Sequence, residues 1–158
     1  MTTTALPVTT HRADAGLTIL RLATGAIFAA HGAQKLFVYG FAGVTGAFGE
    51  MGIPMPGITG PATGLVEFFG GLALVVGLLT RLAGFGLAVT MLGAISLVHI
   101  GGGFFAPNGV EFPLALLAAA SALAFTGAGR YSVDALIARR RATRHVVEVP
   151  TRASNRAA

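Results

Sequence analysis

The stretch from Leu82 to Val110 contains no Asp, Glu, Lys or Arg side chain. An uncharged, mostly apolar run of this length is typical of a helix that crosses a membrane, which takes about 20 residues for a ~30 Å hydrocarbon layer. Three further apolar segments have a similar length. The four expected spans cover about residues 16–38, 59–80, 82–100 and 112–128. The pattern therefore predicts an all-α integral membrane protein, folded as a four-helix bundle.

The composition supports a membrane protein. Hydrophobic residues make up 54% of the chain and charged residues only 11%, against roughly 25% charged in ordinary soluble domains. Too few polar side chains are available to cover a soluble globular domain, and a disordered chain would need low hydrophobicity. The chain has no cysteine, which excludes disulfides, iron–sulfur clusters and zinc–thiolate sites within it.

The positive charge is concentrated at the C-terminal end. Residues 1–129 carry four basic and four acidic side chains, so the net charge of +5 comes from the tail that begins at Arg130. Lys and Arg mark the cytoplasmic ends of membrane helices, and the loops 39–58 and 101–109 contain neither residue. Four spans with both termini in the cytoplasm satisfy this bias. The tail follows an apolar body, so a lipid surface is its expected partner rather than nucleic acid.

Three parts are expected along the chain. Residues 1–14 are polar and rich in threonine, which predicts a disordered leader, residues 15–130 form the membrane domain, and residues 131–158 form a basic cytoplasmic tail. In the tail, Ser132 is a candidate N-cap for a short interfacial helix over 133–144. The basic residues expected at the membrane interface are Arg21, Arg81, Arg139, Arg140, Arg141 and Arg144.

Small residues recur at four-residue spacing within the spans. Examples are the pairs Gly25 and Ala29, Gly60 and Gly64, and Gly84 and Ala88. This spacing lets helix backbones approach closely in lipid, so the sequence predicts a compact bundle.

Six polar side chains interrupt the outer halves of the predicted spans. With both termini inside, the first and third helices run outward and the other two inward, which places all six at a similar depth. An ionisable group within a span is costly and marks a functional site by default. Lys35 and Glu67 are the expected pair, since either charge alone would be costly to desolvate. The six are His31, Gln34, Lys35, Glu67, His99 and Glu111.

This cluster suits a quinone headgroup. His31 and Lys35 would stabilise charge on a quinone oxygen, and Glu67 and His99 would carry protons, because histidine titrates near neutral pH. No pair of candidate ligands shows metal-binding spacing, so no metal site is predicted. Electrons would come from a partner, because the chain carries no cofactor of its own. The other side chains expected to contact the ligand are Gln34, Phe68 and Glu111, with aromatic walls from Phe28, Phe37, Phe68, Phe69, Phe104 and Phe105.

Simpler interpretations stay open for the same residues. Lys35 could extend to the outer headgroups, or its pair with Glu67 could be purely structural. His99 could be a helix-end residue that faces solvent. Glu111 could do no more than complement the positive end of a helix dipole.

Four motifs occur in order along residues 15–137. The first is His31-Gly-Ala-Gln-Lys35-Leu-Phe, and the second is Glu67-Phe-Phe-Gly-Gly71, followed by Gly77-Leu-Leu-Thr-Arg81-Leu-Ala. The others are Asn108-Gly-Val-Glu111-Phe-Pro and Gly127-Ala-Gly-Arg130-Tyr-Ser-Val-Asp134. Together they resemble landmarks of the DoxX family of small bacterial membrane proteins. Val38-Tyr39 departs from the family pattern, in which glycine and aromatic residues follow the first motif.

The resemblance implies a four-helix protein of the bacterial inner membrane. Some relatives are the small subunit of a thiosulfate:quinone oxidoreductase, and others are associated with membrane oxidoreductase complexes that include soluble enzymes. The expected function is therefore that of a quinone-interacting or redox-associated subunit, and whether the chain itself turns over a substrate stays open. By resemblance the motif positions are His31, Gln34, Lys35, Glu67, Arg81 and Glu111.

Two other functions fit the same sequence. A non-enzymatic membrane anchor or assembly factor would gather soluble redox enzymes at the cytoplasmic face through the basic tail. A proton-coupled small-molecule transporter is the third hypothesis. Four short helices leave little room for alternating access unless the chain forms a homo-oligomer.

Overall fold

The computed structural model describes residues 8–147, and all regular secondary structure in this range is helical. Helix α1 (Val8–Ala33) continues through a π-helical segment, η1 (Gln34–Tyr39), into α2 (Gly40–Glu50), and α3 (Pro56–Val76) follows after a short turn. Helix α4 (Thr80–Ala94) continues through a second π-helical segment, η2 (Ile95–His99), and a 3₁₀ turn, η3 (Ile100–Gly102). The last two helices are α5 (Glu111–Thr126) and α6 (Val133–Val147). The expected all-α class is confirmed for these residues, which contain no strand.

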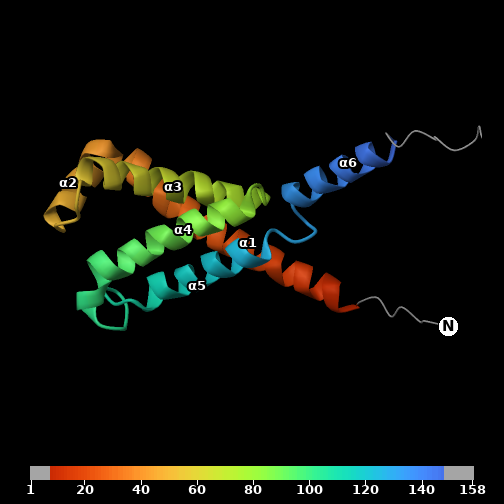
Figure 1. Cartoon of the computed structure of the whole chain (residues 1–158). Coiled ribbons are helices and arrows are strands. Elements are labelled where there is room, and N and C mark those ends of the chain that lie inside the picture. Colours follow the sequence, from red (N-terminus) through yellow and green to blue (C-terminus); the bar gives the residue numbers. More distant parts are fainter. Residues whose placement is uncertain (1–7, 148–158) are drawn as a thin grey trace, which may run out of the picture.

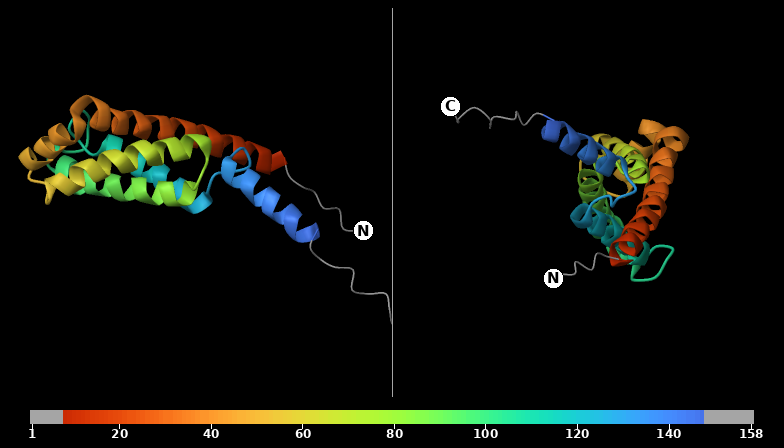
Figure 2. Two further views of the ribbon diagram at one scale, coloured as in Figure 1. Left: turned by 90° about the horizontal axis from the view of Figure 1, so that it is seen from above. Right: turned by 90° about the vertical axis from the view of Figure 1, so that its right-hand side faces the viewer.

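Four helices form an elongated bundle in which the chain reverses direction at each connection (Figure 1). Helix α1 packs along α3, and α4 packs along α5. The start of α1 and the start of α6 lie at one end of the bundle, and α2 lies at the other (Figures 1 and 2). We call these the terminal end and the α2 end. Both ends of the described chain therefore leave the bundle on the same side.

Three helical stretches are long and apolar enough to cross a membrane, namely His11–Glu50, Pro56–Val76 and Thr80–Gly102. Helix α5 is also apolar, but its 16 residues reach only about 24 Å at 1.5 Å per residue. The bundle is apolar inside, where Phe28 and Leu123 are almost fully buried, and apolar outside, where Phe85 is 64% and Phe125 83% exposed. An apolar outer surface on three long helices and one shorter helix fits a lipid environment.

Two stretches of the chain differ from the sequence-based expectation. Helix α1 begins at Val8, so residues 8–14 of the expected leader are helical, while residues 1–7 lie outside the described part of the chain. The segment 39–58, expected to be a loop, contains helix α2. Six of its eleven residues are glycine or alanine, but Phe41, Val44 and Phe48 follow a helical spacing between them, and Val44 is buried. Packing of that face on α3 outweighs the low helix propensity of glycine.

Glycines bring the paired helices into backbone contact, as the spacing of small residues predicts. A Cβ on Gly25 would lie 2.7 Å from the carbonyl oxygen of Gly71, and a Cβ on Gly32 would overlap the backbone of Phe68. In the other pair, a Cβ on Gly84 would lie 2.8 Å from the carbonyl oxygen of Ala120. No larger residue fits at these positions without separating the helices.

Arg21, expected at the membrane interface, is buried inside the terminal end and is only 2% exposed. Its guanidinium donates hydrogen bonds to the carbonyl oxygens of Leu74 and Val75, both at 3.2 Å, and of Tyr131 at 2.7 Å. The last carbonyl groups of a helix lack a full set of helical partners and form the negative end of its dipole. Arg21 therefore caps α3 and connects α1 to the segment that precedes α6.

Asp134 joins the two neighbouring helix ends. Its carboxylate accepts hydrogen bonds from the N–H groups of Leu79 at 2.8 Å and Thr80 at 3.0 Å, where α4 begins. Its own N–H donates to the carbonyl oxygen of Gly77 at 2.9 Å, where α3 has ended in a left-handed residue with a φ of 72°. A Cβ at position 77 would meet the guanidinium of Arg21. Gly77 and Asp134, which both belong to the family-like motifs, therefore have a structural role at the terminal end.

We expect Asp134→Ala to destabilise the protein by about 1–2 kcal/mol, the usual cost of removing a helix N-cap side chain. The midpoint of thermal unfolding in detergent micelles measures the effect. Asp134→Asn keeps one acceptor oxygen and is expected to lose less than half as much. An unchanged midpoint for Asp134→Ala would contradict the capping role.

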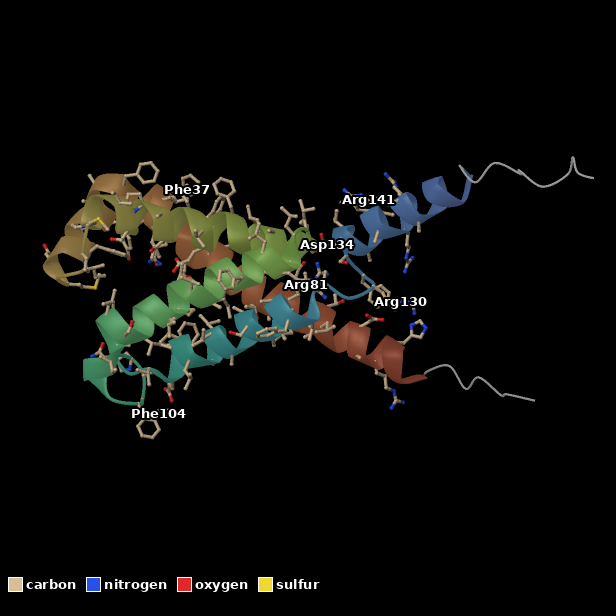
Figure 3. The ribbon with its side chains drawn as sticks, in the orientation of Figure 1. Phe37, Arg81, Phe104, Arg130, Asp134 and Arg141 are labelled. Carbon is tan, nitrogen blue, oxygen red and sulfur yellow. The ribbon has the colours of Figure 1, made fainter. Side chains whose placement is uncertain are left out.

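Helix α6 begins as the sequence predicts. The hydroxyl oxygen of Ser132 accepts a hydrogen bond from the N–H of Ala135 at 3.2 Å, which is the geometry of an N-cap. Arg139, Arg140 and Arg141 are exposed on this helix, which extends away from the bundle (Figure 3). The side chain of Arg144 lies outside the described part of the structure.

Candidate functional site

A buried ion pair lies towards the α2 end of the bundle. Nζ of Lys35, on η1, and Oε2 of Glu67, on α3, are 2.5 Å apart and form a hydrogen bond. The Glu67 side chain is 4% exposed and that of Lys35 22%. The two residues that the sequence identifies as the expected pair are therefore in contact. The bond engages Oε2, so Oε1 can accept a bond from a ligand or from water.

Lys35 and His99 both lie in π-helical segments. Lys35 belongs to η1 (Gln34–Tyr39), and His99 ends η2 (Ile95–His99). Such segments are rare and occur frequently at functional sites, because the wider turn redirects side chains. Two such segments at the same end of the bundle make this end the candidate location of a functional site.

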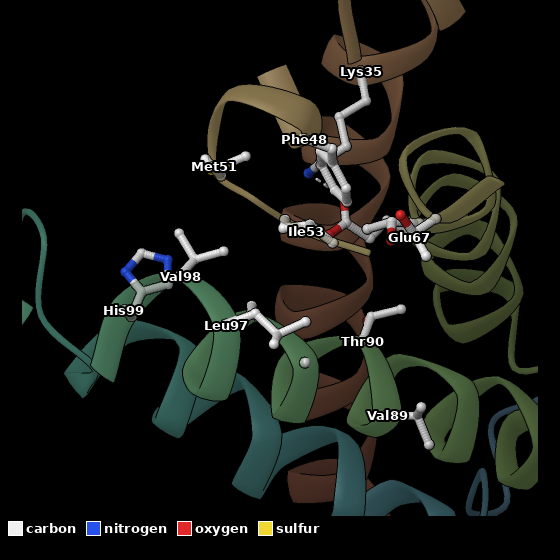
Figure 4. A pocket seen from close by; sticks show the side chains of 14 residues that line it. Lys35, Phe48, Met51, Ile53, Glu67, Val89, Thr90, Leu97, Val98 and His99 are labelled. Atoms are coloured by element: carbon white, nitrogen blue, oxygen red, sulfur yellow. Dashed lines mark hydrogen bonds and ion pairs between the residues drawn. The ribbon is translucent and has the colours of Figure 1, made fainter. Parts of the chain in front are cut away.

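A cavity of about 380 Å³ opens beside the ion pair, and we call it the α3–α4 cavity. Figure 4 shows Lys35 pointing from η1 towards Glu67, with Thr90 and Leu97 facing them from α4 and η2. Its volume falls in the range of small-molecule sites, which are mostly apolar and carry a few polar groups. The polar side chains that line it are Lys35, Thr59, Thr63, Glu67, Thr90 and His99.

A second cavity of about 230 Å³ also borders the pair and is lined mainly by residues of α1, α4 and α5. We call it the α1–α5 cavity. It shares Lys35, Glu67 and His99 with the first, and His31 adds a fourth polar side chain. The His31 ring also lies 6.2 Å from that of Phe112. The ion pair therefore lines both cavities, and His31 lines only the smaller one.

The orientation of His99 is fixed by the loop that precedes α5. Its Nδ1 lies 3.1 Å from the carbonyl oxygen of Asn108. A carbonyl oxygen only accepts hydrogen bonds, so this contact requires a proton on Nδ1. In that tautomer the other ring nitrogen, Nε2, is an acceptor and can bind a hydroxyl group or water.

The other predicted site residues lie elsewhere. Oε1 of Glu111 accepts a hydrogen bond from the N–H of Ala106 at 2.7 Å, which holds the loop before α5. Gln34 is exposed and lines neither cavity. Phe68 packs edge-on against Phe37, with ring centroids 5.4 Å apart, and also lines neither cavity.

The aromatic walls differ from the prediction. Phe28 and Phe112 line the α1–α5 cavity, and Phe48 lines the α3–α4 cavity. Phe37, Phe69, Phe104 and Phe105 are more than half exposed. Of the six phenylalanines expected around the site, Phe28 lines one of these cavities.

Sequence reasoning missed the side chains that α2 and its turn contribute. Phe48, Met51 and Ile53 line the α3–α4 cavity, in a stretch interpreted as a loop. Their signal was the helical spacing of Val44, Phe48 and Met51. Within residues 8–147 there is no group of three His, Asp or Glu side chains arranged to hold a metal ion.

The fold and the site together define a small helical membrane protein with a partly polar cavity inside the α2 end. Its sequence matches the DoxX family model over residues 16–100. A second model, described as the TQO small subunit DoxD, matches over residues 62–149. The first match spans more than half of the chain, so the protein belongs to the DoxX family, as its motifs predict.

Three bacterial relatives cover most of the chain. "Putative oxidoreductase CatD" of Bacillus subtilis is 32% identical over 124 residues, which are 78% of this chain and 88% of that protein. The uncharacterized membrane protein Rv3486 of Mycobacterium tuberculosis is 33% identical over 132 residues, covering 77% and 80%. An uncharacterized protein of Haemophilus influenzae is 33% identical over 122 residues, covering 75% and 87%. No solved structure matches the chain.

Proposed function

We propose that the protein is a redox-associated subunit of the bacterial inner membrane that binds a quinone in the α3–α4 cavity. The observation that supports this best is the buried Lys35–Glu67 pair at the wall of a 380 Å³ cavity. A charged pair inside an apolar bundle is costly. Binding of a ligand that accepts a hydrogen bond from Lys35 would explain why the bundle contains this costly pair, whereas helix packing alone does not require it.

The chemistry of the cavity fits a flat ligand with one polar edge. The Lys35 ammonium can donate to a quinone oxygen and stabilise negative charge that develops there. Glu67 and His99 can hold a proton near the same oxygen. Phe48, Met51 and Leu97 supply apolar walls. The quinone would carry the redox chemistry, and the chain would bind and orient it.

The relatives support a redox setting. One model that matches residues 62–149 describes the small subunit DoxD, and the relative from Bacillus subtilis carries the name of an oxidoreductase. By the distribution of Lys and Arg, the terminal end would face the cytoplasm and the α2 end the outer side. A soluble redox enzyme would then meet the exposed arginines of α6 on the cytoplasmic side.

We expect Gly93→Leu to remove the bound quinone while the protein stays folded. Gly93 lines the α3–α4 cavity, and a Cβ there meets no atom within 4 Å. A leucine side chain would therefore fill the cavity without disturbing the helix contacts. Mass spectrometry of organic extracts from nanodisc-embedded protein should show stoichiometric quinone in wild type. The variant should retain roughly tenfold less, which corresponds to about 1.4 kcal/mol of binding energy.

Gly46→Leu is the matched control. Gly46 lies on α2, a Cβ there also meets no atom within 4 Å, and the residue does not line the α3–α4 cavity. This variant should retain quinone like wild type. Quinone that persists in Gly93→Leu would place the ligand elsewhere. Wild-type protein without quinone would contradict the proposal and favour the anchor or assembly role.

A further inference from the structure

A polar stripe runs along α3 to the ion pair. Thr59, Thr63 and Glu67 are spaced four residues apart and all line the α3–α4 cavity. Residues four apart lie on one helix face, one turn above the other. Helix α3 begins at Pro56, so the stripe starts at the α2 end. From Thr59 it continues to Glu67, which lies about 12 Å further along the helix at 1.5 Å per residue.

The rest of α3 shows that the stripe is not a general feature of this helix. The neighbouring side chains Ala62, Leu65, Val66 and Phe69 are apolar and exposed on the outside of the bundle. The hydroxyl group of Thr59 donates to the carbonyl oxygens of Pro54 and Met55, both at 3.1 Å. Its oxygen keeps a lone pair that can accept a hydrogen bond from water. The polar atoms of α3 thus gather on the cavity side.

Such a cavity can hold water. A buried water needs space and two to four polar partners. The α3–α4 cavity has a volume of about 380 Å³. Thr59 and Thr63 offer hydroxyl groups at successive turns of α3 between the α2 end and the carboxylate, and Thr90 lines the same cavity from α4. Water in this path would reach Oε1 of Glu67, the oxygen that the bond with Lys35 does not use.

We propose that Thr59, Thr63 and Glu67 line an aqueous path from the α2 end to the Lys35–Glu67 pair, through which protons exchange with the medium on that side. The inference builds on the proposed function, because it gives the same site its proton supply. Thr63 is the positioning residue halfway along the path. The ligand would enter the site from lipid or from this opening, but its protons would come from water at the α2 end.

The absence of cysteine from the chain permits a direct test by single cysteine substitution. Thr59→Cys, Thr63→Cys and Ala62→Cys are prepared in nanodiscs and treated with a water-soluble, cationic methanethiosulfonate. The reagent needs a thiolate, which forms in water and not in hydrocarbon. We expect Thr59→Cys to react fastest and Thr63→Cys more slowly. Ala62→Cys, at the same depth but exposed on the outside, should react at least about a hundredfold more slowly than Thr63→Cys.

Two results would overturn the inference. The first is an unreactive Thr63→Cys beside a reactive Thr59→Cys, which would mean that the opening is dry below its mouth. The second is equal reactivity of Thr63→Cys and Ala62→Cys, which would mean that no defined path exists. Labelling with maleimide in denaturing detergent confirms that each thiol is present. The test uses no quinone, so a wet path with no retained quinone would refute the proposed ligand and leave the path standing.

Discussion

Glu67→Leu is expected to destabilise the protein by about 3 kcal/mol, because it leaves the Lys35 ammonium in the bundle without its counter-charge. Breaking a buried ion pair by removing one partner costs about 3–5 kcal/mol. The lower end applies because the Lys35 side chain is 22% exposed. The midpoint of thermal unfolding in detergent micelles measures the loss. Glu50→Leu, at an exposed carboxylate at the end of α2, is the control and should shift the midpoint little.

The double variant Lys35→Met, Glu67→Leu is expected to recover most of that stability. Replacing both members of a buried pair by apolar side chains of similar volume is often neutral or stabilising. The double-mutant cycle then gives the coupling between the two side chains. If the double variant unfolds at the same midpoint as Glu67→Leu, the unpaired Lys35 charge is not the cause of the lost stability. An unfolding midpoint of Glu67→Leu equal to that of wild type would indicate that the Lys35 ammonium extends to the lipid headgroups instead.

The same double variant separates the structural and functional interpretations of the pair. If the pair only fixes helix register, the stable double variant should retain quinone. If the pair binds the headgroup, the double variant should be folded and empty. We therefore expect the double variant to keep its stability and lose its quinone. A single substitution of Lys35 or Glu67 cannot separate these two effects, because it changes both.

The sequence predicted the contact between Lys35 and Glu67 for a physical reason. The direction of each helix follows from the order of the spans. Two opposite charges within apolar helices are expected to pair, because each charge alone would carry a large desolvation penalty. The four motifs were enough to identify the DoxX family by resemblance, and the spacing of small residues was enough to predict close contact between helices. The depth of Lys35 and Glu67 could be predicted because chain order and hydropathy indicate how far along a span each residue lies.

Other parts of the site depend on contacts that the sequence does not show. Helix α2 is rich in glycine and forms because Val44 packs against Gly60 of α3, where a Cβ would lie 3.0 Å from the Val44 side chain. Charge counting placed Arg21 near headgroups, but it cannot distinguish an exposed arginine from one that caps the end of α3. Most of the phenylalanines expected around the site do not line either cavity, since depth alone does not give the side of the helix that a phenylalanine occupies.

The second large effect is expected from Gly71→Leu, which should prevent α1 and α3 from packing together. A Cβ at this position would overlap the backbone of Ala29 and lie 2.7 Å from the carbonyl oxygen of Gly25. Overpacking usually costs about 1–3 kcal/mol because side chains adjust. Here the obstacle is helix backbone, which cannot move without separating the pair. The loss should therefore exceed about 3 kcal/mol.

Helix α1 carries Lys35 through η1, and α3 carries Glu67, so separating these two helices should also remove the ion pair and open the α3–α4 cavity. Gly71→Leu should therefore lose the monodisperse peak in size-exclusion chromatography and any bound quinone together. Gly16→Leu on α1 is the control, since a Cβ there meets no atom within 4 Å. A folded Gly71→Leu that still bound quinone would show that the site does not depend on close approach of α1 and α3. In lipid, where apolar side chains gain little from leaving the solvent, this backbone contact is what holds the two halves of the site together.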